Sequence, residues 1–146
     1  MPRRKLTPYE KQLRQEKRDA AEVAKTLLPV LEKDKDWALV TGKEPNMGET
    51  RFLRARTRLT KKAVQLLQPN MKISCTAGHG TAWNWVYVRL IVSEEPSREL
   101  SRKLRTLTEN VLTALNIGYG TYFTDYGPDL GGGICQNLSV QVEWDG

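Results

Sequence analysis

Apolar residues recur at two different spacings along this chain, and the spacings predict an ordered set of helices and strands. Spacings of three and four residues, typical of one face of a helix, occur over residues 8–29, 49–67 and 97–116. Alternating or short β-forming runs predict strands over residues 37–41, 71–76, 83–92 and 138–144, with a further short strand over 121–124. Without that short strand, the predicted order is α-β-α-β-β-α-β. We expect an α+β fold, in which a small, mostly antiparallel sheet carries helices on one face.

The first predicted helix has a strong start signal and two unlike halves. Thr7 can cap the helix, and Glu10 completes a capping box. The first half is nearly all polar, whereas the second half has the apolar spacing that packing requires. Pro29 is expected to end or kink the helix. We therefore predict a basic N-terminal helical arm over residues 1–35 and a single α+β domain over residues 36–146.

Alternation in the strand over residues 83–92 separates two kinds of side chain, because successive residues point to opposite faces of a sheet. One face carries the mostly aliphatic set Asn84, Val86, Val88, Leu90 and Val92. The other face carries Trp83, Trp85, Tyr87 and Arg89. The aliphatic face is expected to lie under the helices. The sequence leaves open whether the aromatic face is exposed to solvent or covered by the N-terminal helix.

Charge is distributed unevenly along the chain, which has a formal net charge of +6 at pH 7. Residues 43–72 carry eight Lys and Arg residues against two acidic residues. Residues 115–146 carry four acidic residues and no Lys or Arg. A clustered positive field favours polyanions such as nucleic acid or an anionic membrane. The alternative is a helix face whose charges are simply solvated.

The aromatic strand face and the basic helix together favour a non-enzymatic nucleic-acid-binding module. Bases stack on aromatic rings while Lys or Arg neutralises phosphate, so single-stranded nucleic acid or RNA is the favoured ligand. The basic tail of Arg3, Arg4 and Lys5 would add sequence-independent affinity. The residues assigned to the interface are Trp83, Trp85, Tyr87, Arg89, Arg51, Arg54, Arg56, Arg58, Lys61, Lys62 and Lys72.

Two other functions remain open from the sequence. The same aromatic face suits a protein-interaction or inhibitor module, because Trp, Tyr and Arg are enriched at binding hot spots. A small hydrolase or nuclease would have to use His79, the only histidine, together with Asp125. No recognisable catalytic motif is present, and one histidine with two cysteines predicts neither a metal nor a cofactor. We therefore assign no catalytic residue.

The apolar runs and the cysteines of the chain indicate in which cellular compartment the protein is found. No apolar run reaches the ~18–20 residues that span a bilayer, and the basic N-terminus lacks the apolar segment of a secretory signal. Cys75 and Cys135 lie far apart in apolar or strand-like runs, and both are expected to be reduced and buried. The sequence predicts a cytoplasmic protein that does not associate with a membrane.

The run from Leu59 to Val92 contains a helix, a Pro-Asn-Met-Lys-Ile-Ser step at residues 69–74, a Gly-containing tip and an alternating strand. This pattern, followed by a helix, resembles domains appended to large polyvalent proteins of phages and conjugative elements. The likeness covers roughly residues 60–125 and leaves out the N-terminal helix. It implies a mobile-element setting, in which small basic α+β proteins often bind nucleic acid or a host defence protein. That family has no established chemistry, so the resemblance transfers no catalytic residue.

Overall fold

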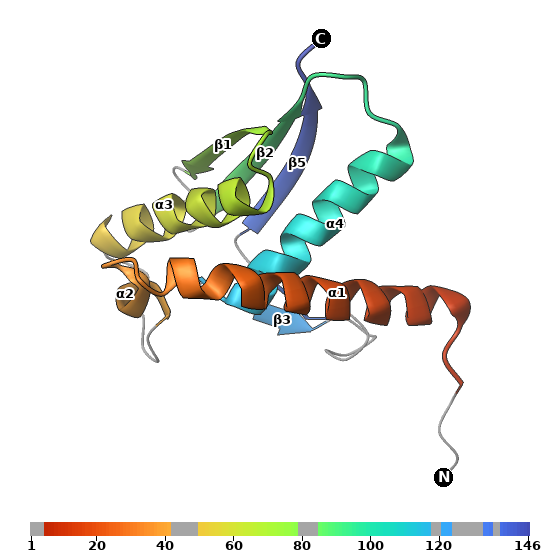
Figure 1. Ribbon diagram of the computed structural model, residues 1–146, viewed down its shortest axis with the longest axis horizontal. Coiled ribbons are helices and arrows are strands. Elements are labelled where there is room, and N and C mark those ends of the chain that lie inside the picture. The colour runs from red at the N-terminus through yellow and green to blue at the C-terminus, as the bar shows by residue number, and fades with distance from the viewer. Residues whose placement is uncertain (1–4, 42–49, 79–84, 118–120, 124–132, 136–137) are drawn as a thin grey trace.

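The helices and strands form an α+β fold, as the sequence predicts (Figure 1). The computed structural model describes residues 5–41, 50–78, 85–117, 121–123, 133–135 and 138–146. The helices in this part are α1 (Pro8–Leu31), α2 (Trp37–Thr41), α3 (Thr50–Leu67) and α4 (Arg98–Leu115). The strands are β1 (Lys72–Ala77), β2 (Val86–Val92), β3 (Thr121–Phe123), β4 (Gly133–Cys135) and β5 (Leu138–Trp144). The three predicted helices are confirmed, whereas α2 and β4 are elements that the sequence analysis did not predict.

The main sheet is mixed, which differs from the mostly antiparallel sheet that the sequence predicts. Its strand order is β1-β2-β5, with β1 antiparallel and β5 parallel to β2. Two antiparallel strands can be joined by a short hairpin, whereas a parallel pair needs a long crossover. Helix α4 forms part of the crossover from β2 to β5. Strands β3 and β4 form a separate antiparallel pair.

The core lies between the sheet and the helices, which gather on one of its faces (Figure 1). Val86, Val88 and Leu90 of the central strand β2 are fully buried. They join a cluster that includes Phe52 of α3 and Leu112 of α4. The aliphatic side of this strand is therefore the covered side, as the alternation predicts.

Helix α1 begins where the sequence predicts. The Thr7 hydroxyl accepts a hydrogen bond from the Glu10 N–H at 3.1 Å, and the Thr7 N–H donates to the Glu10 carboxylate at 3.2 Å. These two bonds form the predicted capping box. The helix passes Pro29 and ends at Leu31, within one turn of the proline that was expected to end or kink it. Pro29 has no N–H to donate to the carbonyl four residues back, so it removes one helical hydrogen bond, and the helix continues for only two residues beyond it.

The segment predicted as an N-terminal arm packs along the rest of the fold. Helix α1 lies against α4 and α3, and its residues Ala20 and Ala24 belong to the common core. The polar half of α1 also makes a contact, because Glu16 forms an ion pair with Arg102 of α4 at 3.4 Å. Packing therefore extends beyond the apolar second half of the helix.

Residues 37–41 form helix α2, so the strand predicted there is wrong. The Thr41 hydroxyl donates to the carbonyl of Trp37, four residues back, at 2.6 Å. The turn before the helix is stabilised by the Asp34 carboxylate, which accepts the N–H of Asp36 at 3.0 Å. This local bond and the tertiary packing of the short run outweigh its β propensity, which depends strongly on context.

Replacing Thr7 with alanine tests whether α1 unfolds together with the domain. The change removes the side-chain acceptor of the capping box, so the free energy of unfolding is expected to fall by about 1 kcal/mol. Urea denaturation would show this as a lower midpoint with an unchanged slope. Thr26→Ala is the matched control, because Thr26 is an exposed position within the helix, where alanine has the higher helix propensity. A wild-type midpoint for Thr7→Ala would contradict the packing of α1.

Candidate nucleic-acid interface

The face of the main sheet that points away from the helices carries one set of alternate residues from each strand. Side chains directly opposite each other on paired strands lie on the same face, and the strand register therefore fixes the set. We call this surface the open sheet face. Its residues are Lys72, Ser74, Thr76, Trp85, Tyr87, Arg89, Ile91, Ser139, Gln141 and Glu143.

Trp85 and Tyr87 form a stacked pair on the open sheet face. Their ring centroids lie 6.3 Å apart and their planes differ by 17°. The pairing follows from the sequence, because residues two apart in a strand point the same way. Trp85 is 38% exposed and Tyr87 is half-buried. Aromatic surface of this kind remains available to a flat ligand.

The cations of the open sheet face are Lys72 and Arg89. Lys72 is exposed. The Arg89 guanidinium donates two hydrogen bonds to the Glu143 carboxylate, one of them at 2.8 Å. These bonds raise the pKa of Arg89 and lower the pKa of Glu143. Both side chains remain well exposed, and an exposed ion pair of this type contributes little to stability. Breaking this ion pair therefore costs little stability. An external anion can take the place of Glu143 as the partner of the Arg89 guanidinium.

The N-terminal helix does not cover the aromatic side chains that the structure describes. Helix α1 packs on α4 and α3, and these helices lie on the opposite face of the sheet (Figure 1). The thiol of Cys75, which points to the helix side, donates to the Thr57 carbonyl of α3 at 3.4 Å. The choice that the sequence left open is therefore settled for Trp85 and Tyr87, whereas Trp83 lies outside the described residues.

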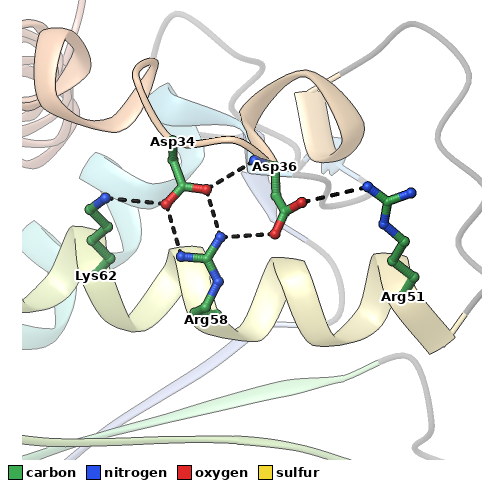
Figure 2. A network of polar contacts seen from close by, with 5 residues as sticks. All are labelled: Asp34, Asp36, Arg51, Arg58 and Lys62. Carbon is green, nitrogen blue, oxygen red and sulfur yellow. Dashed lines mark hydrogen bonds and ion pairs between the residues drawn. The ribbon is translucent and has the colours of Figure 1, made fainter.

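Several cations of helix α3 that were assigned to the interface are bound to acidic residues of this chain (Figure 2). Arg58 makes a bidentate contact with Asp34, at 2.8 and 2.6 Å, and a further bond to Asp36 at 2.9 Å. Lys62 donates to Asp34 at 3.2 Å, and Arg51 lies 3.8 Å from Asp36. The network links the turn before α2 to α3. These cations therefore serve first to hold two segments of the fold together.

The remaining α3 cations differ in exposure. The side chain of Arg56 is fully buried, with its guanidinium carbon 5.8 Å from the centre of the Phe52 ring. Its position could have been read from the sequence, because Arg56 lies four residues after Phe52 and three before Leu59, on the apolar stripe. Arg54 and Lys61 are exposed. Since α3 packs on the covered face, the structure does not bring these cations to the open sheet face.

The residues of the hydrolase alternative, His79 and Asp125, lie outside the described residues. Cys75 is a free, half-buried thiol, and burial raises its pKa to about 12. The thiol is therefore protonated at neutral pH, and a thiol is a weaker nucleophile than a thiolate. Sequence reasoning left Ser139 and Gln141 out of the interface, although the alternation of β5 already separated them from the aliphatic residues.

A comparison with protein-family models, curated proteins and solved structures found no match to this chain. The resemblance to domains of large polyvalent proteins therefore stays a prediction. Among the helices that the structure describes, none has the length and apolar character needed to cross a membrane. The described residues also contain no group of three or more His, Cys, Asp or Glu side chains that could hold a metal ion.

The ion-pair network predicts a specific pH dependence of stability. Hydrogen bonds from Arg58, and then from the backbone of Asp36, hold the pKa of the Asp34 carboxyl well below its usual range. The contribution of a carboxyl whose pKa is lowered on folding is complete above its unfolded pKa of about 3.9. It is lost as the pH falls from there towards the folded pKa.

Asp34→Asn is therefore expected to lower the free energy of unfolding by about 1–2 kcal/mol at pH 7, since the Asp34 side chain is only 6% exposed but Arg58 is half-exposed. Denaturation at several pH values should show the difference from wild type shrinking below about pH 4. Glu22→Gln, which removes a charge from an exposed ion pair with Lys25, should have little effect. A constant difference for Asp34→Asn down to the lowest pH would refute the assignment.

Proposed function

We propose that this protein binds single-stranded nucleic acid, either RNA or DNA, on the open sheet face. The observation that carries the proposal is the stacked pair of the exposed Trp85 and the half-buried Tyr87, on a face that none of the described helices covers. Stacking of a base on an exposed aromatic ring contributes about 1–3 kcal/mol and is available to every base. Binding with little sequence preference follows from this mode of contact.

The polar neighbours of the aromatic pair support the same ligand. Ser74 and Thr76 of β1 and Ser139 and Gln141 of β5 flank the central strand in the strand register. Their hydroxyl and amide groups both donate and accept hydrogen bonds. Such groups suit the base edges and sugar hydroxyls of an unpaired strand.

Phosphate contacts on this face fall to Lys72 and Arg89. A strand lying on the open sheet face is separated by the sheet itself from the cations of α3. The proposal therefore leaves Arg51, Arg54, Arg56, Arg58, Lys61 and Lys62 out of the site. With two cations available, few counterions are released on binding, and the salt dependence of affinity is expected to be shallow.

Fluorescence anisotropy with labelled single-stranded oligonucleotides tests the stacking surface. Trp85→Leu and Tyr87→Leu keep apolar cover on the sheet but remove the aromatic ring. Each is expected to weaken binding by about 5- to 150-fold, which corresponds to a loss of about 1–3 kcal/mol. Tyr9→Leu is the matched control, because Tyr9 is a 58% exposed aromatic residue on α1, and it should bind like wild type.

The same titrations across a salt series test which cations contact phosphate. Two neutralised phosphates predict a slope of log affinity against log salt of about −1.4, whereas six α3 cations would give about −4. The Arg54→Ala, Lys61→Ala double variant should retain wild-type affinity. Absence of binding at low salt, or wild-type binding by Trp85→Leu and Tyr87→Leu, would rule out the open sheet face as the site.

A further inference from the structure

A groove runs between the first half of helix α4 and strand β5, at the edge of the main sheet, and it meets the open sheet face at Gln141. It has a volume of about 840 Å³. Its helical wall carries Arg98, Arg102 and Arg105, and its strand wall carries Val140, Gln141 and Val142. Figure 1 shows α4 running alongside β5. The groove therefore joins a basic helix face to a strand of the main sheet.

Strand β5 is an edge of that sheet. In the described part of the chain its sheet partner is β2 alone, on one side. An edge strand presents a row of backbone N–H and C=O groups that another chain can pair with. At β5 this row borders the arginine-lined groove, because residues 140–142 of the strand form one of its walls.

The three arginines form a row along the groove. Their spacing of four and three residues puts them on one face of α4. Arg98 lies in the first turn of the helix, where the helix dipole disfavours positive charge. Arg102 contacts the Glu16 carboxylate at 3.4 Å. Arg105 interacts electrostatically with Glu109, one turn further along α4, although neither Arg98 nor Arg105 has an ion pair within 4.0 Å among the described residues.

We propose that this groove binds an extended acidic segment of a partner protein, which adds to the sheet as a strand beside β5. Backbone hydrogen bonds to the β5 edge would give affinity, and alternate side chains would face α4. Carboxylates at three alternate positions of a strand span roughly 14 Å. The arginine row spans roughly 10 Å along the helix, a difference that the long arginine side chains can bridge.

Two other occupants fit the groove less well. A second copy of this chain would bring its own arginine row towards the first if the two β5 edges paired about a two-fold axis, and like charges would repel. A nucleic-acid strand would satisfy the arginines but would leave the backbone groups of the β5 edge without a matching ladder. The acidic peptide satisfies both the charges and the edge.

The probe for this proposal is a labelled peptide of about nine residues, blocked at both ends, with glutamate alternating with threonine or valine. Binding to the full chain is followed by fluorescence anisotropy. Arg98→Glu with Arg105→Glu is expected to weaken binding at least about tenfold. Arg18→Glu with Arg54→Glu makes the same change in net charge at exposed positions on α1 and α3, and it should leave binding within about twofold.

Two further peptides separate strand addition from simple charge attraction. N-methylation of alternate amides on the edge that faces β5 should abolish binding, whereas methylation on the other edge should not. A peptide of the same composition with its glutamates clustered at one end should bind at least about tenfold more weakly. Equal binding by the clustered peptide, or indifference to N-methylation on both edges, would overturn the proposal.

The peptide-binding test can fail or succeed independently of the test of the nucleic-acid site. Trp85→Leu with Tyr87→Leu should leave peptide affinity unchanged, since these residues do not line the groove. Displacement of the peptide by an oligonucleotide whose own binding requires Arg98 and Arg105 would assign the groove to nucleic acid instead. Dimerisation that is lost in the Arg98→Glu, Arg105→Glu variant would assign it to a second copy. Either result would overturn the proposal.

Discussion

Burial of one side of the central strand β2 determines how the helices and the other strands of the main sheet are arranged. Val86, Val88 and Leu90 are fully buried, and each side chain of this size contributes about 1.5–3 kcal/mol when it leaves water. A slip of one residue would exchange them for the opposite set and bring the charge of Arg89 into the core. The register with both neighbouring strands and the gathering of helices on one face follow from this requirement. The exposed position of the aromatic pair is its direct consequence.

The positively charged side chains of this protein fall into two groups. Some pair with acidic residues within the fold, and others have no such partner in the part of the chain that the structure describes. The dense positive run of α3 looks like a ligand-binding surface in the sequence, but the fold pairs several of its cations with acidic residues of the same chain and buries Arg56. Arg58 and Lys62 hold Asp34, and Arg56 is buried against an aromatic ring. Among the described residues, the cations without an ion pair within 4.0 Å include Arg54 and Lys61 of α3 as well as Arg98 and Arg105 of α4. A cluster of Lys and Arg residues in the sequence is therefore a poor guide to the positive field at the surface. Acidic residues that are distant in the sequence pair with some of these cations in the fold and neutralise them.

Long periodic segments made most of the fold predictable from sequence, and the exceptions have physical causes. The apolar stripe of α4, with Ser97 and Asn116 as its caps, and the alternation of β2 specified these elements and the two faces of the sheet. The run over 37–41 was too short for periodicity to decide between strand and helix, and tertiary contacts decided it. The direction of β5 was not predictable, because alternation is the same in parallel and antiparallel strands. The side chain of Arg56 could have been predicted as buried from its place on the apolar stripe.

The solvent exposure of Trp85 and Tyr87 in solution decides whether this face of the sheet is open. NMR with a soluble paramagnetic agent reports the accessibility of individual side chains, and the exposed ring of Tyr9 and the buried ring of Phe52 provide internal limits. If this sheet face is open, the Trp85 indole will show strong relaxation enhancement, below that of the more exposed Tyr9, and the ring of Tyr87 a clear but smaller enhancement. Enhancements as low as those of Phe52 would show that this sheet face is covered, and would contradict the account.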